Sequence, residues 1–176
     1  MSPTFPQKVI RYCPKCGSID FNFNRDNSFL CGICSFHLYI NSAAAVAALI
    51  VNEAGELLLT RRAIEPQFGM LDLPGGFVDV METAENAIHR EIKEELNLKI
   101  REMNYFMSFP NEYVFGGLSV FTTDLAFICQ IDSFESIQAK DDISAFEFYQ
   151  PEEIPLNEIG SVSMKEIVKA FVNSKQ

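Results

Sequence analysis

Apolar and polar residues follow two different periods along this chain. Ala43 to Val51 is a continuous apolar run, which is typical of a strand buried on both faces. Asn52 to Gly55 carries the residues of a turn, and Glu56 to Arg61 then predicts a second strand. Three later ranges also predict strands: 99–109, 118–131 and 146–149. A loop is expected at 111–117, between the first two of these strands. The second half of the chain is therefore expected to be rich in strands.

Helical periodicity is confined to two main segments. The first begins after Thr83, a good N-cap residue, and its apolar arc consists of Ala84, Ala87, Ile88, Ile92 and Leu96. Asn97 can adopt the left-handed conformation that ends a helix. The second segment, Ser163 to Val172, has apolar residues at helical spacing near the end of the chain. Strands mixed with two helices predict an α+β fold.

Three glutamates of the first helix are unusually placed. Glu91 and Glu95 fall within the apolar arc and Glu94 lies on its flank, whereas amphipathic helices normally carry carboxylates on the opposite side. Like charges at this spacing repel by about 0.2 to 0.5 kcal/mol per pair. A hard divalent cation, Mg²⁺ or Mn²⁺, would compensate, because these ions take oxygen ligands. The alternative is a set of surface glutamates paired locally with Arg90 and Lys93.

Four cysteines near the N-terminus form a second candidate metal site. Cys13 and Cys16 make one Cys-x-x-Cys pair, Cys31 and Cys34 make another, and fourteen residues separate the pairs. This spacing favours a tetrahedral, closed, structural zinc site over two disulfides or a redox pair. A segment this short depends on the metal to fold. We therefore expect a zinc ribbon at residues 1–42 and a second domain at 43–176, with Cys129 as a buried thiol.

Composition narrows the possible functions. The 176 residues, 48% of them hydrophobic, suffice for one ordinary domain and a small module. No signal peptide and no membrane span are expected, so the expected location is cytoplasmic. The net charge of -10 argues against binding to a nucleic-acid backbone. A small polyanionic substrate remains compatible if metal ions supply positive charge.

The central motif resembles a known family signature. Gly76, five residues, Glu82, seven residues and then the run Arg90 to Leu98 together resemble the signature box of Nudix hydrolases. Asn97 stands where that family usually has glycine. The resemblance extends over about residues 43 to 155 and implies the Nudix α/β/α sandwich around a mixed sheet. With the preceding ribbon, the chain resembles the zinc-ribbon branch that includes NADH, FAD and ADP-ribose pyrophosphatases.

The resemblance also implies roles for individual residues. Glu91 and Glu95 would be the principal ligands of the catalytic ion, with Glu94 in the cluster and the Gly75 carbonyl completing the shell. Arg90 would hold a glutamate in position, or form a surface pair with Glu94.

An acidic residue from a later loop is expected to act as a ligand or general base. Asp142 is our choice and Glu112 the other candidate, although adjacent aspartates in a loop are often merely solvated. The expected substrate-binding residues are Arg61, Arg62, Gly76, Phe109 and Tyr113, the two aromatic residues by stacking on a base.

The expected function is therefore that of a Mg²⁺- or Mn²⁺-dependent pyrophosphohydrolase with a structural Zn²⁺. Its substrate would be a nucleoside diphosphate linked to another moiety, as in ADP-ribose, NADH or FAD. The alternatives are a nucleotide-pool cleaner acting on nucleoside triphosphates and a non-catalytic nucleotide-sensing protein. Family resemblance also implies a possible homodimer.

Overall fold

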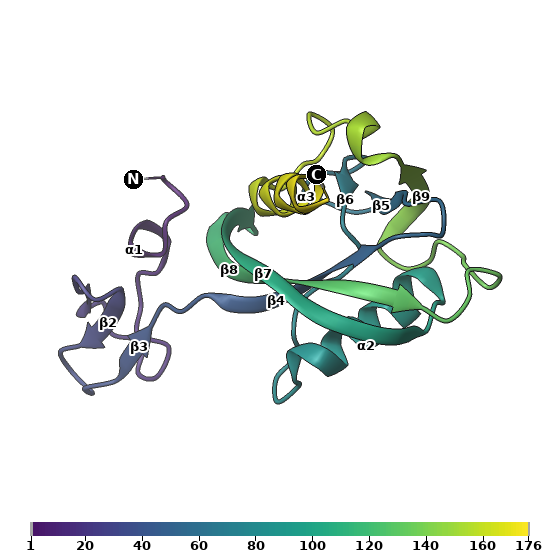
Figure 1. Ribbon diagram of the computed structural model, residues 1–176. Coiled ribbons are helices and arrows are strands. Elements are labelled where there is room, and N and C mark those ends of the chain that lie inside the picture. Colours follow the sequence, from purple (N-terminus) through teal and green to yellow (C-terminus); the bar gives the residue numbers. More distant parts are fainter. Residues whose placement is uncertain (1, 176) are drawn as a thin grey trace. The chain divides into compact units, whose positions relative to one another are not determined.

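The computed structural model (Figure 1) describes residues 2–175 and divides into two compact units. The first unit contains the residues up to Ser42 together with Glu112–Phe121, and the second contains Ala43–Asn111 and the chain from Thr122 onward. The chain therefore crosses between the units three times. Among residues 2–175, no helix is long and apolar enough to span a membrane.

The first unit is built on a small antiparallel sheet. Its strands are β1 (Phe21–Phe23), β2 (Ser28–Cys31) and β3 (His37–Tyr39), and the short helix α1 (Pro6–Val9) precedes them. The core of this unit is small, and four of its members are buried: Cys13, Phe21, Phe29 and Cys31. Two of the cysteines therefore form part of the apolar core.

A long hairpin replaces the loop expected at 111–117, so that expectation was wrong. Strand β7 runs from Ile100 to Phe115 and β8 from Leu118 to Ile131. Only Gly116 and Gly117 separate them, and both have positive φ angles, of 57° and 79°. Two adjacent residues with positive φ form the tight turn that matches the twist of a hairpin, so the strands can continue to its end.

The end of this hairpin belongs to the first unit. The Ser119 backbone N–H donates to the Thr4 carbonyl at 2.8 Å, and the hydroxyl groups of the two residues lie 2.9 Å apart. The rings of Phe5 and Phe121 pack edge to face with centroids 5.6 Å apart. The expected domains did not anticipate this, because they assigned every residue after 42 to the second domain.

The second unit contains two three-stranded sheets and two main helices. Its remaining elements are β4 (Ala43–Ile50), β5 (Leu57–Arg62), β6 (Leu71–Asp72), α2 (Ala84–Leu96), β9 (Ile143–Tyr149), the short 3-10 helix η1 (Pro151–Glu153) and α3 (Val162–Ser174). One sheet has the order β4-β8-β7, with β4 parallel to β8, and the other has the antiparallel order β6-β5-β9. The expected α+β fold with a mixed sheet is confirmed, with its strands shared between two sheets.

From Ala45 to Ile50, strand β4 is buried on both sides, as its continuous apolar sequence predicted. Its residues alternate between a cluster with Ile88 and Ile92 of α2 and a cluster with Ile167 and Phe171 of α3. Figure 1 shows α2 and α3 on opposite sides of these strands. The layers are thus helix, strands, helix.

Both ends of α2 are fixed by the residues expected to cap it. The Thr83 hydroxyl accepts the Asn86 N–H at 3.2 Å. Asn97 has φ 55° and ψ 29°, and its N–H donates to the carbonyls of Ile92 and Lys93. The two caps therefore fix where α2 begins and ends, and with that the directions in which its glutamates point.

Candidate functional site

The glutamates of α2 differ in burial because they lie at different angles around the helix. Glu95 is buried, with 6% of its surface exposed, and its carboxylate accepts the Gly75 N–H at 3.0 Å. The Glu91 side chain is 14% exposed, and that of Glu94 is 48% exposed. The family resemblance implies that the Gly75 carbonyl joins the metal shell, which stays a prediction, and the Gly75 N–H binds one of the candidate ligands.

Two glycines allow the backbone to approach this carboxylate pair. A Cβ on Gly75 would lie 2.1 Å from the Val46 carbonyl oxygen, and Gly75 also has a φ of 145°. A Cβ on Gly76 would lie 2.5 Å from Oε1 of Glu91. A side chain at position 75 would collide with the backbone of β4, so that position needs glycine, whereas a side chain at position 76 would require the Glu91 carboxylate to move.

Arg90 uses all five of its N–H donors, four of them on carboxylates. Its Nε and Nη2 bind Glu82 at 3.0 and 2.8 Å, and Nη1 binds Glu91 at 2.7 Å and Glu94 at 3.2 Å. The second Nη2 donor reaches the Phe77 carbonyl at 3.0 Å. The expected pairing with Glu94 and the positioning of another glutamate are thus both present. Such a fork fixes side-chain orientation as well as charge.

Glu82 is a site residue to which sequence reasoning assigned no role. Its fixed distance before Arg90 in the motif was the available signal. The hydrogen bonds from Arg90 hold the pKa of Glu82 below its ordinary value, so this carboxylate stays ionised.

Burial acts against the charge of the other two carboxylates. Desolvation raises the pKa of Glu95 well above its ordinary value, and the charges of Glu91, Asp72 and Asp142 raise it further. Desolvation also raises the pKa of Glu91. Among residues 2–175, no Lys, Arg or His side chain forms an ion pair with Glu95.

These oxygen donors fit a hard divalent cation. A cation beside Glu91 and Glu95 would favour their charged forms and offset the desolvation of both. The carboxylates are less tightly gathered than the cysteines of the first unit. Within the described part of the chain, only the cysteine group brings three or more potential ligand atoms within 4.8 Å of one another.

The loop before β9 brings two aspartates to the glutamates. The charge of Asp142 raises the pKa of Glu95, and that of Asp141 raises the pKa of Glu91. The loop is attached to α2 directly, because the Lys140 N–H donates to the Glu95 carbonyl at 2.8 Å. Sequence reasoning chose Asp142, and the structure brings both aspartates close.

The two arginines expected to contact substrate are engaged with neighbouring carboxylates. Arg61 binds Glu147 at 2.7 Å and Glu158 at 3.0 Å. Arg62 binds Asp72 at 3.0 Å, and its Nε donates to the Pro66 carbonyl at 2.8 Å. Nothing in the local sequence indicated Glu147 or Glu158 as partners, since they lie 86 and 97 residues away. In this structure both arginines are therefore held by contacts within the protein, and their binding to substrate stays a prediction.

The expected aromatic stack is not assembled within one unit. Phe109 belongs to the second unit, where it packs on the apolar cluster that includes α3. Tyr113 and Glu112 belong to the hairpin end in the first unit. Nothing in the sequence marked this boundary between the units, because the boundary falls within a single strand, β7.

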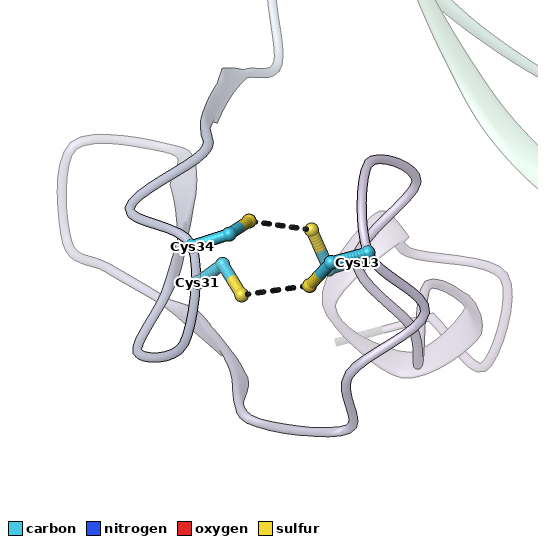
Figure 2. Close-up of side chains that lie close together, drawn as sticks. Cys13, Cys31 and Cys34 are labelled. Atoms are coloured by element: carbon cyan, nitrogen blue, oxygen red, sulfur yellow. Dashed lines mark hydrogen bonds between the residues drawn. The ribbon is translucent and has the colours of Figure 1, made fainter.

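The four cysteines of the first unit converge from two loops, as Figure 2 shows. The Sγ atoms of Cys13 and Cys34 are 3.7 Å apart, and those of Cys16 and Cys31 are 3.6 Å apart. A disulfide would need about 2.05 Å, whereas four thiolates at about 2.3 Å from a tetrahedral zinc lie about 3.8 Å apart. The observed spacing therefore fits zinc and excludes disulfides in this arrangement.

The two cysteine loops share one backbone design. In each, the carbonyl of the first cysteine accepts an N–H four residues later: Gly17 donates to Cys13 at 2.8 Å and Ser35 to Cys31 at 3.0 Å. Both donors have positive φ angles, of 74° and 56°. Hydrogen bonds, above all from the backbone N–H of Cys34 and then from that of Ile33, lower the pKa of the Cys31 thiol to about 7, which favours the thiolate that binds metal.

Comparison with known proteins gives a consistent match over most of the chain after residue 40. The NUDIX domain model matches residues 41–171. An ADP-ribose pyrophosphatase from Methanocaldococcus jannaschii is 34% identical over 122 residues, covering 68% of this chain and 69% of that protein. A NAD-capped RNA hydrolase NudC from Deinococcus radiodurans is 32% identical over 125 residues, covering 68% of this chain but 44% of that protein. The chain thus spans less than half the length of this NudC relative.

Among solved structures, a NUDIX hydrolase from Nitrosomonas europaea superposes with a TM-score of 0.71 at 21% identity. The alignment covers 94% of this chain and 92% of that one. At this identity, the likeness shows a shared fold.

Proposed function

Because the chain belongs to the NUDIX domain family, we propose that it is a Mg²⁺- or Mn²⁺-dependent pyrophosphohydrolase. Its substrate is a nucleoside diphosphate linked through its pyrophosphate to a second group. The observation that carries the proposal is the pair Glu91 and Glu95, two buried or nearly buried carboxylates beside Gly75 and Gly76 with raised pKa values. Such a pair is costly in an ordinary helix and useful where a cation must be held.

The roles of the residues follow from their contacts. Glu91, Glu94 and Glu95 would hold the divalent ion. When bound, the ion neutralises phosphate oxygens and lowers the pKa of a coordinated water. Arg90 keeps Glu91 and Glu94 oriented while its second edge is fixed by Glu82. Gly75 adds a backbone N–H that orients Glu95.

Asp142 is the proposed acceptor of the proton from the attacking water. It lies on the loop attached to the end of α2, and its negative charge raises the pKa of Glu95. Asp141 is the alternative, because it has the same relation to Glu91. A carboxylate in this position can act as a general base only within hydrogen-bond reach of that water.

The substrate class rests on the names of the relatives. One relative is named for ADP-ribose and the other for NAD-capped RNA, and ADP-ribose and NAD both contain adenosine diphosphate joined to a second group through the pyrophosphate. For the first unit, we propose a structural zinc ribbon centred on the four cysteines, which holds residues 2–42 and the hairpin end in one fold.

The test is turnover on a panel of ADP-ribose, NADH, FAD and nucleoside triphosphates with Mg²⁺ or Mn²⁺, with products separated by chromatography. Two monophosphates from each dinucleotide would support the proposal. Inorganic pyrophosphate released from a triphosphate would indicate a nucleotide-pool enzyme instead. No turnover of any substrate by folded, zinc-loaded protein would contradict hydrolysis and favour a binding protein.

A matched pair of variants ties activity to the site. Glu95→Gln removes a proposed ligand and should lower kcat by roughly 100-fold or more, because the divalent ion that stabilises charge on the phosphate would be held less firmly. Glu85→Gln changes an exposed glutamate in the first turn of the same helix and should leave kcat unchanged. Equal activities of the two variants would remove α2 from the mechanism.

A further inference from the structure

The side chain of Asn97 makes contacts that are not needed to end α2 in the left-handed conformation. Its amide donates to the Ser136 carbonyl at 3.0 Å, 39 residues further along the chain. The Ser136 hydroxyl returns a hydrogen bond to the Asn97 carbonyl at 3.1 Å. Lys93 donates to the Asn97 side-chain oxygen at 2.8 Å, which orients the amide. Glycine would suit this left-handed backbone better but could make no side-chain contact.

Two further hydrogen bonds extend this connection back along the helix. The Gln138 N–H donates to the Leu96 carbonyl at 3.0 Å, and the Lys140 N–H donates to the Glu95 carbonyl at 2.8 Å. The last carbonyls of a helix have no partner within it, so the loop supplies what this helix end needs. Three consecutive residues of the helix end are thus joined to three alternate residues of one loop.

This loop carries the two aspartates of the candidate site. Asp141 and Asp142 directly follow Lys140, and the Asp142 carbonyl accepts the Ala63 N–H at 2.7 Å. Ile143, the next residue, is buried in the α2 core. The loop is therefore fixed on both sides of the aspartates. Before them it is bound to the end of α2, and after them it is held by the hydrogen bond to Ala63 and by the burial of Ile143.

We propose that Asn97 is a positioning residue for hydrolysis: it fastens segment 136–142 to the end of α2 and so keeps Asp141 and Asp142 beside Glu91 and Glu95. The inference rests on the proposed function, because those aspartates matter only where the glutamates hold a catalytic ion. It assigns a task to the one position of the signature run where this chain departs from glycine.

Asn97→Gly separates this role from a purely conformational one. Glycine adopts the same backbone more easily, so a residue needed only to end the helix would be replaced without loss. Removal of the amide instead leaves the Ser136 carbonyl without its side-chain donor, although the Ser136 hydroxyl can still bind the backbone carbonyl of residue 97. We expect kcat to fall by roughly 3- to 10-fold, the equivalent of one lost hydrogen bond, with KM changed by less than about twofold.

Two measurements do not depend on turnover. The dissociation constant for Mn²⁺, from the electron paramagnetic resonance signal of the free ion, should rise by roughly the same factor. The Lys140 and Gln138 amides should exchange with solvent faster. Asn97→Asp retains the side-chain shape but faces the Ser136 carbonyl with an oxygen, so it should be at least as impaired as the glycine variant.

The matched control is Asn27→Gly. Asn27 has nearly the same backbone conformation, with φ 57°, but lies in the first unit. This variant should match the parent in kcat, Mn²⁺ affinity and exchange of the two loop amides.

Two results would overturn the proposal: an Asn97→Gly variant equal to the parent in all three measurements, or faster exchange with unchanged Mn²⁺ affinity and kcat. If the parent hydrolyses no substrate, the proposed function fails by itself. Weaker Mn²⁺ binding with faster loop exchange would then still support the fastening role.

Discussion

At the scale of single residues, the site depends on carboxylates that solvent does not stabilise. Glu95 is buried, accepts one backbone N–H and lies near three other carboxylates that raise its pKa. In the absence of a cation, its charge opposes folding. The same residue therefore connects stability with function.

The pH dependence of unfolding should reveal this opposition. Because the folded-state pKa of Glu95 is raised, the folded protein holds the proton more tightly than the unfolded chain does. Stability is then greatest below the ordinary pKa of 4.5 and is lost as pH rises through the folded-state value. Glu95→Gln removes this loss, at most about 1.4 kcal/mol per pH unit.

Urea unfolding without added divalent cation, from acid to neutral pH, measures the effect. We expect the variant to become more stable than the parent by a margin that grows with pH. A margin that stays constant or shrinks would show that Glu95 is not a destabilising charge.

Arg90 offers a second test at this scale. Arg90→Lys keeps the positive charge but cannot donate to Glu82, Glu91 and Glu94 together, because lysine lacks the planar fork. We expect kcat/KM to fall by roughly 10- to 100-fold, as for other residues that orient metal ligands. Arg101→Lys is the control, since Arg101 binds the exposed Gln130 side chain away from the glutamates of α2. An Arg90→Lys variant as active as this control would deny Arg90 an orienting role.

Sequence reasoning located the charged residues of the site but not all their partners. Glu91, Glu94 and Glu95 were identified because they break the pattern of an amphipathic helix. The ion pairs of Arg61 could not be identified from the sequence, because its partners come from β9 and from the chain after β9. Local patterns carry no information on which distant residue a side chain meets.

At the scale of elements, α2 is the segment that the sequence described best. Its N-cap, its apolar face and its left-handed end were all expected and are all present. Each depends on neighbours within one or two turns, so each can be read locally. The hairpin was misjudged for the opposite reason: Asn111, Glu112 and the two glycines at 116 and 117 resemble a loop until the paired strand is known.

The Thr83 cap gives a prediction for this element. Thr83→Ala leaves the Asn86 N–H without its side-chain acceptor and should lower the free energy of unfolding by about 1 kcal/mol, within the 0.5 to 2 kcal/mol typical of such caps. Thr83→Ser keeps the hydroxyl and should lose much less. Chemical denaturation of the three proteins measures the difference. Equal losses for alanine and serine would mean that the cap oxygen contributes nothing.

At the scale of the whole molecule, the division into units leads to a prediction about zinc. Cys34→Ser removes one of four thiolates, so zinc content should fall well below one ion per chain. Residues 2–42 and 112–121 should lose protection from hydrogen exchange together, because they form one unit, while α2 stays protected. Cys129→Ala, in the second unit, should retain the zinc. Loss of protection confined to 2–42 would contradict the shared unit.

The sequence predicted the boundary near residue 42 from the cysteine spacing, but it could not reveal the second part of this unit. Ser119 and Phe121 alternate with their neighbours as any strand does. Only their pairing with Thr4 and Phe5 identifies them as part of the ribbon unit.

That pairing has a consequence for protein engineering. A fragment cut at Ala43 would carry a hairpin tip stripped of Thr4 and Phe5, and a ribbon transplanted alone would lack Ser119 and Phe121. Exchanging modules between relatives therefore requires moving two stretches of the gene at once. A chimera joined at a single point would leave apolar side chains exposed on either the ribbon or the hairpin end.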